Sequence, residues 1–376
     1  MCIRDSVWCV ERTSGTWRSN AAQFTKSFLN KGLQDRPITR DTDWGVPVPL
    51  AGYESKKIYV WFEAVLGYLS ASRHYAKERN TPDIWEKWWH NPDAVHYYVH
   101  GKDNVPFHTV ILPAILLGAG DFHLPDRVFA SEFLSLEGKQ FSTSRSYGVW
   151  VPDFLKHFDS ELLRYFVIAQ GPETSDIDFR WSEFGRLVNG ELIGTFGNLV
   201  NRICAFAEKN FPEGVAVSIP EGTQMSAVLD AEANGMLSTT EAAVETVGKN
   251  IETGKFRRAF REILKVAEAG NQFAHIREPW KRIKEDREQT QKDVLVLLHT
   301  IRTLAILVQP FLPKTSATIQ SFFSSPAITS EAGLKIYSAW RYHPIPSSIT
   351  VSNTKVLFMK VEEEDIQKQR EKLGLE

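Results

Sequence analysis

Residues 94–136, AVHYYVHGKDNVPFHTVILPAILLGAGDFHLPDRVFASEFLSL, decide the fold of the first part of the chain. Residues 94–99 are rich in β-branched and aromatic side chains, which predicts a strand. Residues 106–117 form an apolar run long enough for a buried helix, and residues 127–136 return to a strand pattern before a glycine. Strand-helix-strand order predicts a parallel, doubly wound sheet in an α/β domain.

Before residue 94 the stretches with regular apolar spacing are shorter. Residues 20–32 place apolar side chains at helical spacing and end in a glycine, which predicts an amphipathic helix. Residues 58–62 are a brief apolar run that predicts a strand, and residues 64–71 continue as a helix. We therefore expect a second transition from strand to helix before the main unit.

A different pattern follows Trp150. No further strand is predicted, and four long segments show helical periodicity: residues 151–169, 183–210, 225–269 and 293–308. The 376 residues are also too many for one ordinary hydrophobic core. The sequence therefore predicts an α/β domain followed by an all-helical domain.

Composition excludes several classes of protein. Hydrophobic residues make up 43% of the chain and charged residues 24%, which argues against disorder or a fibrous fold. The formal net charge is -2, so any nucleic acid must be bound by a local basic surface. No run of about 18 apolar residues occurs, so we expect no membrane association.

The three cysteines are Cys2, Cys9 and Cys204. They lack a paired C-x-x-C spacing, which argues against a disulfide framework and against a complete zinc site. A reducing cytoplasm fits this usage, and no metal ligand can be assigned.

The first candidate site follows the predicted strand 94–99. Gly101, Lys102 and Asp103 come where a parallel strand ends and a helix begins, which is where ligands bind in such sheets. Asp103 could accept a ribose hydroxyl there, and the helix start offers unpaired N–H groups. The alternative is an N-cap at Asp103 with His108 packed in a core.

The second candidate is the loop 138–145, GKQFSTSR, after the predicted third strand. Its hydroxyls and the cations Lys139 and Arg145 suit a polyphosphate, because mobile cations can neutralise charge that develops on transferring phosphates. A solvated turn is the alternative.

The third candidate consists of Trp61, Ala64 and Tyr68, where a predicted strand leads into a helix. Two aromatic rings could form the walls of a pocket for an apolar side chain. The alternative is that they belong to an ordinary core.

The fourth candidate lies in the helical part. Asn198 and Arg202 are four residues apart and share a helix face, and Trp280 stands at a helix start beside Lys281 and Arg282. An aromatic ring of this kind can stack an unpaired RNA base, worth roughly 1–3 kcal/mol. The alternative for Trp280 is a hydrophobic staple between helices.

Six blocks in order carry a family resemblance: ITRDTDWGVPVP, YVWFEAVLGYLSA, GKDNVPFHTVILPA, EGKQFSTSR, FGNLVNR and REPWKRIK. Together they resemble methionyl-tRNA synthetases over most of the chain. The resemblance implies a class I nucleotide-binding domain that forms methionyl-adenylate from methionine and Mg²⁺-ATP and then esterifies a methionine tRNA. It implies in-line attack of the methionine carboxylate on the α-phosphate, driven by positioning and charge neutralisation.

The resemblance also implies roles for individual residues. The methionine-binding set is Trp61, Ala64, Tyr68, Phe107 and His108. The ATP-binding set is Gly101, Asp103, Leu134, Gln140, Phe141, Ser142, Thr143 and Ser144, in which FSTSR takes the position of the KMSKS signature. The catalytic set is Lys102, Asp103, Lys139, Thr143 and Arg145, and the set that reads the CAU anticodon is Asn198, Arg202 and Trp280.

This sequence departs from the family pattern in several places. It contains no HIGH-type ATP motif, so we expect an N-terminally truncated chain, and the zinc of the family's knuckle is not expected. Gln140 and Thr143 replace the two signature lysines. No appended dimerisation domain is expected after Leu373.

The domains expected from the resemblance are the following. Residues 1–40 are a remnant of the connective-peptide insertion with its linker, 41–148 the second half of the Rossmann-like catalytic domain, 149–180 a stem-contact linker, 181–338 the α-helical anticodon-binding domain, and 339–376 a C-terminal tail and helix. The alternatives are a tRNA-binding module without catalysis and a synthetase for another apolar amino acid.

Overall fold

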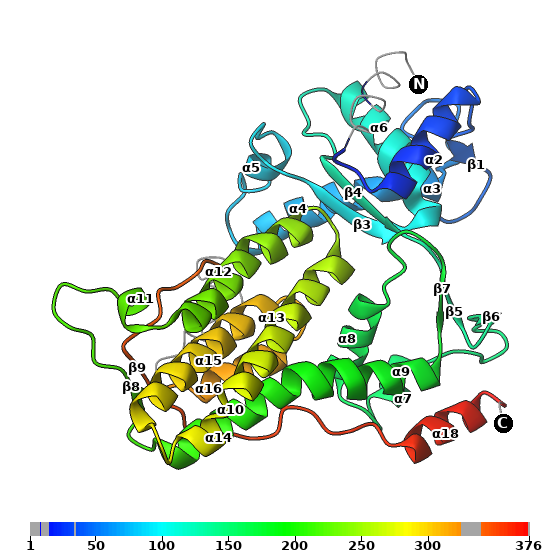
Figure 1. The fold of residues 1–376 in the computed structure, drawn as a ribbon. Helices are drawn as coiled ribbons and strands as arrows, with labels where there is room; N and C mark the ends of the chain where they lie inside the picture. Colours follow the sequence, from blue (N-terminus) through cyan, green and yellow to red (C-terminus); the bar gives the residue numbers. More distant parts are fainter. Residues whose placement is uncertain (1–7, 9–14, 34, 325–339, 375–376) are drawn as a thin grey trace. The chain divides into compact units, whose positions relative to one another are not determined.

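The computed structural model describes residues 8, 15–33, 35–324 and 340–374. The chain divides into two compact units (Figure 1). The first unit consists of Met1–Phe133 and Pro172–Asp176, and the second of Leu134–Gly171 and Ile177–Glu376.

A parallel pair of strands lies at the centre of the first unit. Strand β3 (Tyr97–Gly101) pairs in parallel with β4 (Arg127–Ser131). The crossover between them is a π-helical turn (Phe107–Ile111) that continues into α6 (Leu112–Ala119). The predicted strand-helix-strand unit is therefore confirmed.

Four helical segments complete this unit. They are α2 (Ser19–Asn30), which was predicted, α3 (Val60–Glu63) with the 3-10 turn η1 (Ala64–Leu66), α4 (Gly67–Glu78) and α5 (Glu86–Trp89). The N–H of Arg18 donates to the carbonyl of Val128, and Asn20 Nδ2 donates to that of Ala130. These bonds hold the start of α2 along β4.

The prediction of a strand at residues 58–62 is largely wrong. Only β2 (Lys57–Ile58) is extended, and it pairs antiparallel with β1 (Thr39–Arg40) rather than joining the parallel pair. Residues 60–63 are already helical. A short run of large apolar residues fits strand and helix alike, so periodicity could not separate the two.

The predicted third strand at residues 127–136 is in fact two strands in different sheets. After β4 the chain leaves the parallel pair, because the N–H of Glu132 donates to the carbonyl of Pro172. Strand β5 (Leu134–Leu136) then lies between β6 (Lys139–Gln140), which is antiparallel, and β7 (Ile177–Phe179), which is parallel.

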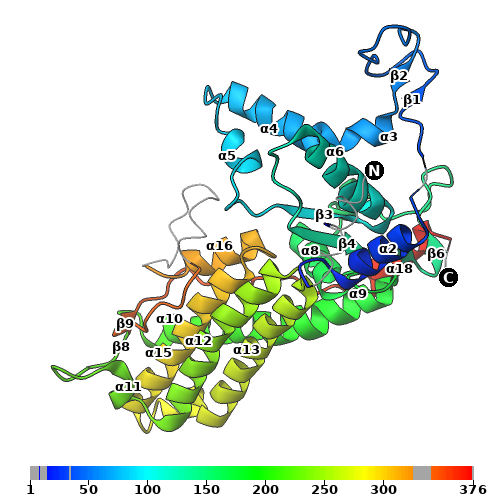
Figure 2. The ribbon, with the colours of Figure 1, turned by 90° about the horizontal axis from the view of Figure 1, so that it is seen from above.

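The second unit is dominated by helices that pack side by side (Figure 2). Its main helical segments are α7 (Val151–Phe154), α8 (Ser160–Ala169), α9 (Trp181–Leu187), a π-helical segment (Val188–Gly197), α10 (Asn198–Asn210), α11 (Met225–Val228), α12 (Ala231–Glu252), α13 (Phe256–Arg277), α14 (Pro279–Arg282), α15 (Arg287–Val308), α16 (Pro313–Ser321) and α18 (Glu363–Lys372). Helix α15 is buried on nearly all sides, since apolar residues surround its axis.

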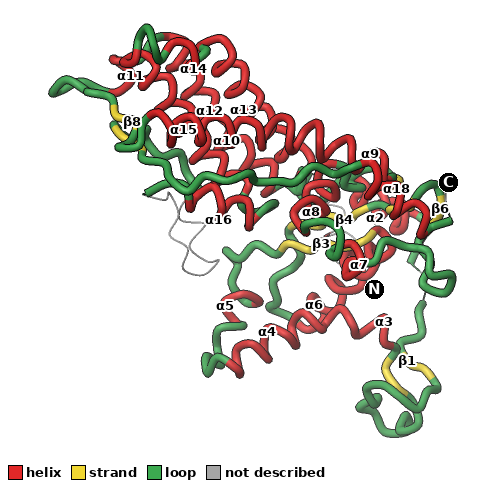
Figure 3. The backbone as a smooth tube through the Cα atoms, turned by 90° about the horizontal axis from the view of Figure 1, so that it is seen from below, coloured by secondary structure: helices red, strands yellow, loops and turns green. Residues whose placement is uncertain are grey.

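The expectation of no strand after Trp150 is wrong. Besides β7, strands β8 (Val215–Ala216) and β9 (Ser348–Ile349) pair antiparallel beside the bundle, so the second unit is not purely helical (Figure 3). Such short strands carry no period-2 signal, and their partners are far apart in the sequence. None of the helices in the described ranges combines the length and apolar character that a membrane crossing requires.

Candidate functional site

One helix face of the first unit carries the predicted aromatic pair. Trp61, Ala64 and Tyr68 follow one another at helical spacing through α3, η1 and α4, and all three are exposed. The ring of Trp61 lies 6.0 Å from that of Phe107. The structure therefore brings the predicted methionine-binding residues of the two segments together.

His108 is buried beside this face and its hydrogen bonds define its protonation. Its Nδ1 is 2.9 Å from the carbonyl oxygen of Asn104, which can only accept, so Nδ1 carries the proton. Its Nε2 therefore accepts from the Tyr68 hydroxyl at 2.9 Å. Burial lowers the pKa of His108, although the Asn104 carbonyl opposes this shift.

The π-helical form of the turn that carries His108 is explained by a nearby proline. Pro113, near the start of α6, has no N–H to donate to the carbonyl four residues earlier. The preceding turn accordingly widens to a π-helix over Phe107–Ile111, a form that is common at functional sites.

Sequence reasoning missed His100. Its ring stacks on His108 with centroids 4.2 Å apart and an interplanar angle of 20°. Burial lowers the pKa of His100 to about 4, and its Nδ1 lies 2.9 Å from the Gly101 carbonyl. Alternation along β3 could have suggested that His100 lies beside the site, but not that two imidazoles stack.

Lys102 is engaged by acidic side chains of the same unit. Its Nζ lies 2.7 Å from both Glu132 Oε2 and Asp176 Oδ1, and 4.0 Å from the centre of the Phe133 ring. The bonds to Asp176 and Glu132 raise the pKa of Lys102. This ammonium ties the end of β3 to the residues that follow β4, while Gly101 and Asp103 beside it are exposed.

The predicted phosphate loop begins as a tight hairpin in the second unit. Glu137 and Gly138 join β5 to β6 with φ angles of 48° and 78°, as a two-residue type I′ turn requires. The Gly138 N–H donates to both carboxylate oxygens of Asp178, at 2.9 and 3.0 Å. Leu134, at the start of β5, is partly buried against the core of this unit.

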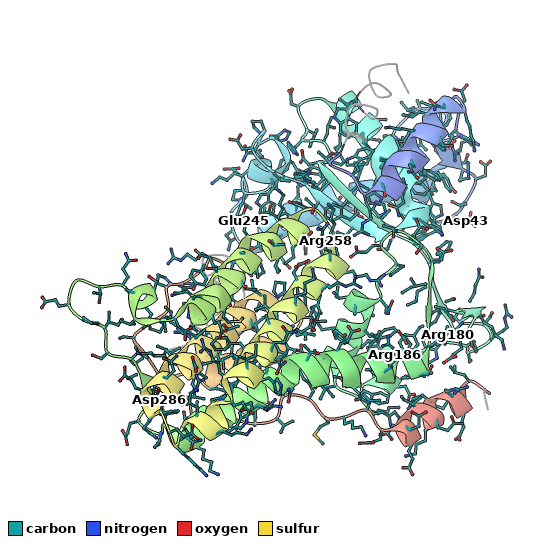
Figure 4. The ribbon with its side chains drawn as sticks, in the orientation of Figure 1. Asp43, Arg180, Arg186, Glu245, Arg258 and Asp286 are labelled. Carbon is teal, nitrogen blue, oxygen red and sulfur yellow. The ribbon has the colours of Figure 1, made fainter. Side chains whose placement is uncertain are left out.

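Asp178 is the anchor of this hairpin and was not predicted. It also accepts from Ser135 Oγ at 2.7 Å and from Arg180 Nε at 2.8 Å; Arg180 is labelled in Figure 4. Burial acts to raise the pKa of Asp178, but the bonds from Gly138, Arg180 and Ser135 outweigh it and lower the pKa.

Beyond β6 the loop folds back on itself. Ser142 and Tyr147 exchange backbone hydrogen bonds of 2.8 and 2.9 Å, and the Tyr147 hydroxyl donates to the carbonyl of Leu136. The tip between them, Thr143, Ser144 and Arg145, is exposed, as are Gln140 and Phe141.

The two cations of this loop remain available for a ligand. Both Lys139 and Arg145 are exposed, and Lys139 Nζ lies 5.7 Å from the centre of the Tyr147 ring. An exposed hairpin with two such cations is suited to binding an anion.

In the helical bundle, Asn198 begins α10 immediately after a π-helical segment. Its Nδ2 donates to Asn271 Oδ1 on α13 at 3.0 Å, and Asn271 Nδ2 donates to the carbonyl of Thr195 at 2.8 Å. Gly270 allows this close approach, because a Cβ there would lie 2.8 Å from Leu199 Cδ2. Asn271 was not predicted, and only the pairing of the two helices identifies it.

Arg202 and Trp280 meet although they are distant in sequence. The Arg202 guanidinium carbon lies 4.4 Å from the centre of the Trp280 ring, which is cation–π geometry. Trp280 is partly buried against the core, whereas Arg202 is exposed. The ring thus both packs against the core, as a staple would, and has a cation at its face.

No metal centre is defined by the described residues. None of them forms a group of three or more histidine, cysteine or acidic side chains that could hold an ion. Cys2 and Cys9 lie outside the described ranges, and Cys204 is buried in the bundle.

The first unit thus holds a parallel β3–β4 pair with a crossover helix, and the second holds a helical bundle. The family described as tRNA synthetases class I (M) matches residues 5–204. The family described as the anticodon binding domain of methionyl tRNA ligase matches residues 219–375. The chain therefore belongs to the methionyl-tRNA synthetase family, and the resemblance read from the six blocks is confirmed.

Similar proteins agree with this assignment. The chain is 38% identical over 365 residues to methionine-tRNA ligase 1 of Alkaliphilus oremlandii, a match covering 97% of this chain and 63% of that protein. It is 44% identical over 317 residues to the methionine-tRNA ligase of a Roseiflexus species, covering 82% of this chain and 52% of that protein. The chain thus spans about half to under two thirds of these relatives' length.

A solved structure supports the fold. The structure of Mycobacterium tuberculosis methionyl-tRNA synthetase bound by methionyl-adenylate matches with a TM-score of 0.78 at 21% identity, covering 95% of this chain and 68% of that one. At this identity the likeness concerns the fold alone. The catalytic fold and the helical anticodon-binding fold are therefore both present, in an α/β chain.

Proposed function

We propose that this chain provides the methionine pocket, the signature loop and the anticodon-reading bundle of a methionine-tRNA ligase. In that reaction methionine and ATP give methionyl-adenylate and pyrophosphate, and methionine is then transferred to its tRNA. The observation that carries the proposal is the tandem match of one chain to a class I (M) family and to a methionyl anticodon-binding family.

The pocket is formed by Trp61, Ala64, Tyr68, Phe107 and His108. Its aromatic walls suit the unbranched, polarisable side chain of methionine, which makes favourable sulfur–aromatic contacts. The neutral His108, bonded to Tyr68, keeps this region free of net charge, so an apolar side chain is not opposed by a desolvated cation. Gly101 and Asp103, at the end of β3, are proposed to meet the ribose of ATP.

The signature loop acts on the phosphates. We assign Gln140, Phe141, Ser142, Thr143 and Ser144 to phosphate binding, with Leu134 beside the adenine. Lys139 and Arg145 then supply the positive charge that the two absent signature lysines would provide, acting on the phosphates of Mg²⁺-ATP. Lys102, which is bound to two carboxylates, is proposed to position the end of β3.

The bundle reads the anticodon. Asn198 offers its side-chain oxygen to a base edge while its Nδ2 is held by Asn271, and Trp280 stacks a base with Arg202 at its face. The RNA that fits this assignment is the anticodon loop of methionine tRNAs, with the sequence CAU.

A second candidate function is tRNA binding without catalysis. It is favoured by one observation, that residues 219–375 by themselves match a family described as an anticodon binding domain. The domain boundaries and the cytoplasmic location expected from the sequence stay predictions.

Two measurements on the 376-residue chain test these functions. The first is binding to anticodon stem-loops carrying CAU or GAU, each at two salt concentrations, because phosphate contacts alone give salt-sensitive binding without base preference. A clear preference for CAU supports the anticodon assignment, and equal affinity contradicts it.

The second measurement is methionine-dependent exchange of pyrophosphate into ATP, with Lys139→Ala and Arg145→Ala as loop variants and Lys26→Ala on α2 as a matched exposed control. Exchange that is lost in the loop variants but kept in the control supports ligase activity. CAU preference without exchange in the parent chain supports the binding module.

A further inference from the structure

The geometry points to Asp293 as a positioning residue for anticodon reading: its buried carboxylate fixes the turn that presents Trp280. This inference rests on the proposed reading of the anticodon by Asn198, Arg202 and Trp280. It adds a residue that contacts no RNA and that the family match does not assign.

The turn that carries Trp280 is conformationally unusual. Glu278 joins α13 to α14 with φ 42° and ψ 56°, in the left-handed region. Residues with a Cβ adopt this region at an energetic cost and persist there when the surroundings hold them. Trp280 follows two residues later, so the direction of its ring depends on this turn.

Two arginines flank the turn, and both lie against Asp293. Arg282, at the end of α14, places Nη1 3.2 Å from Asp293 Oδ2. Arg277, the last residue of α13, places Nε 3.7 Å from Asp293 Oδ1. One carboxylate on α15 thus holds the residue before the left-handed position and a residue four positions after it.

Asp293 is fully buried, so its charged form is stable only with partners that replace water. Burial raises its pKa, while Arg277, a hydrogen bond from Gln289 and Arg282 oppose that shift. The Gln289 bond is 3.0 Å long. A buried carboxylate needs such partners to remain ionised, so its two arginines are in turn held at fixed positions.

The two arginines do not depend on Asp293 equally. Arg277 has two further acidic partners, with Nη2 2.5 Å from Asp230 Oδ1 and 3.2 Å from Glu232 Oε2. Among the described residues, Arg282 forms an ion pair with Asp293 alone. Loss of the Asp293 charge should therefore release α14 while the end of α13 stays in place.

The cap of α15 and the apolar packing of α14 should limit the effect of losing the Asp293 charge to this end of the bundle. Asp286, labelled in Figure 4, caps the start of α15 by accepting from the Gln289 N–H at 2.9 Å. Pro279 is buried, and Trp280 and Ile283 pack against the core. Short α14 is thus held by apolar packing on one side and by the Arg282–Asp293 pair near its end.

The test uses Asp293→Asn, which keeps the shape and can still accept from Gln289 but removes the charge. Its matched control is Glu161→Gln, a second buried carboxylate of the same unit, which accepts from the N–H groups of Lys314 and Thr315 at the start of α16. Each full chain is measured for thermal stability and for binding to CAU and GAU stem-loops.

We expect both variants to lose stability, and only Asp293→Asn to lose the CAU preference, by about tenfold, the scale of one misread base. A CAU preference that is unchanged in Asp293→Asn, or reduced as much in Glu161→Gln, overturns the proposal. If the parent chain itself shows no CAU preference, the proposed anticodon reading fails first, and the role of Asp293 falls with it.

A rescue experiment separates positioning from general destabilisation. Glycine adopts the left-handed region without cost, so Glu278→Gly should leave the parent's preference unchanged and should restore part of it in the Asp293→Asn background. Recovery supports the proposal that Asp293 holds this turn. If the double variant prefers CAU no more than Asp293→Asn alone does, the proposal is contradicted.

Discussion

The proposed methionine site of the first unit and the Trp280 surface of the second, formed by Asn198, Arg202 and Trp280, both place a polar group against an aromatic ring. The charge of that group differs between them. In the pocket, Tyr68 donates to a buried histidine that its environment keeps neutral. On the bundle, an exposed arginine lies on a half-supported tryptophan. The difference matches the ligands proposed for them, an apolar amino acid side chain and a polyanion.

Support for the two sites differs as well. The proposed methionine site joins two segments through the Tyr68–His108 bond, and a local Asn104–His108 bond closes the turn that carries the histidine. The Trp280 surface is held by contacts between α10, α13 and α15, which are far apart in sequence. Packing changes should therefore disturb the second site more than the first.

The largest expected effect comes from adding a side chain where α10 and α13 are in close contact. Gly270→Ala places a methyl group 2.8 Å from Leu199 Cδ2, which should destabilise the chain by about 1–3 kcal/mol and weaken the Asn198–Asn271 bond. Urea unfolding and CAU stem-loop binding measure the two effects. Gly235→Ala on α12, where no atom is within 4 Å, should stabilise by about 0.5–1 kcal/mol. If Gly270→Ala and Gly235→Ala change stability equally, the contact between α10 and α13 at Gly270 is not tight.

A second change removes the stacking ring. Trp280→Ala should weaken CAU stem-loop binding by about 1–3 kcal/mol, since a stacked base loses its partner. Fluorescence anisotropy with a labelled stem-loop measures this loss. Trp44→Ala, at an 84% exposed tryptophan of the first unit, is the matched control and should bind as the parent does. If both variants lose affinity alike, Trp280 has no special role.

Acid should affect the pocket through its histidines. Burial lowers the pKa of His100 to about 4 from an ordinary value near 6.5, so the unfolded chain binds more protons in this window. Stability is therefore fully present above pH 6.5 and falls as the pH drops towards 4. Urea midpoints at pH 7.5, 5.5 and 4.5 should fall less steeply for His100→Phe than for the parent, and His74→Phe on exposed α4 is the control. Parallel slopes for all three proteins would contradict this account.

The smallest expected effect is on the pocket hydrogen bond. Tyr68→Phe leaves His108 Nε2 without its donor and should cost about 1 kcal/mol of stability, together with some methionine affinity. Differential scanning calorimetry and titration with methionine measure both. Tyr75→Phe, an exposed tyrosine on the same helix, should change neither. If the Tyr68→Phe chain is as stable as the parent, the Tyr68–His108 bond adds nothing to the stability of the folded chain.

Much of the local structure could be read from the sequence. The apolar run at residues 106–117 and the long periodic segments of the bundle specify helices, because burial of a continuous face needs that spacing. The residues of both proposed aromatic sites were also named from the sequence, since YVWFEAVLGYLSA, GKDNVPFHTVILPA, FGNLVNR and REPWKRIK carry their positions by resemblance. Their roles stay predictions until the ligands are tested.

The errors have two causes. Residues 58–62 were predicted as a strand because a short apolar run fits strand and helix alike. Residues 127–136 were predicted as one strand, and β7 to β9 were not predicted, because a two- or three-residue strand is defined by its partner and not by its own pattern. The Glu132–Pro172 bond that separates β4 from β5 joins residues that no local window contains.

The sequence by itself determined which long segments are helical, which family the chain belongs to and which residue types stand at the candidate sites. Only the tertiary structure decided that His100 stacks on His108, that Asp178 anchors the signature hairpin, and that Arg202 lies on Trp280 while Asp293 holds its turn. The physical reason is that helix formation depends on neighbours along the chain, whereas desolvation and the pairing of buried charges depend on neighbours in space.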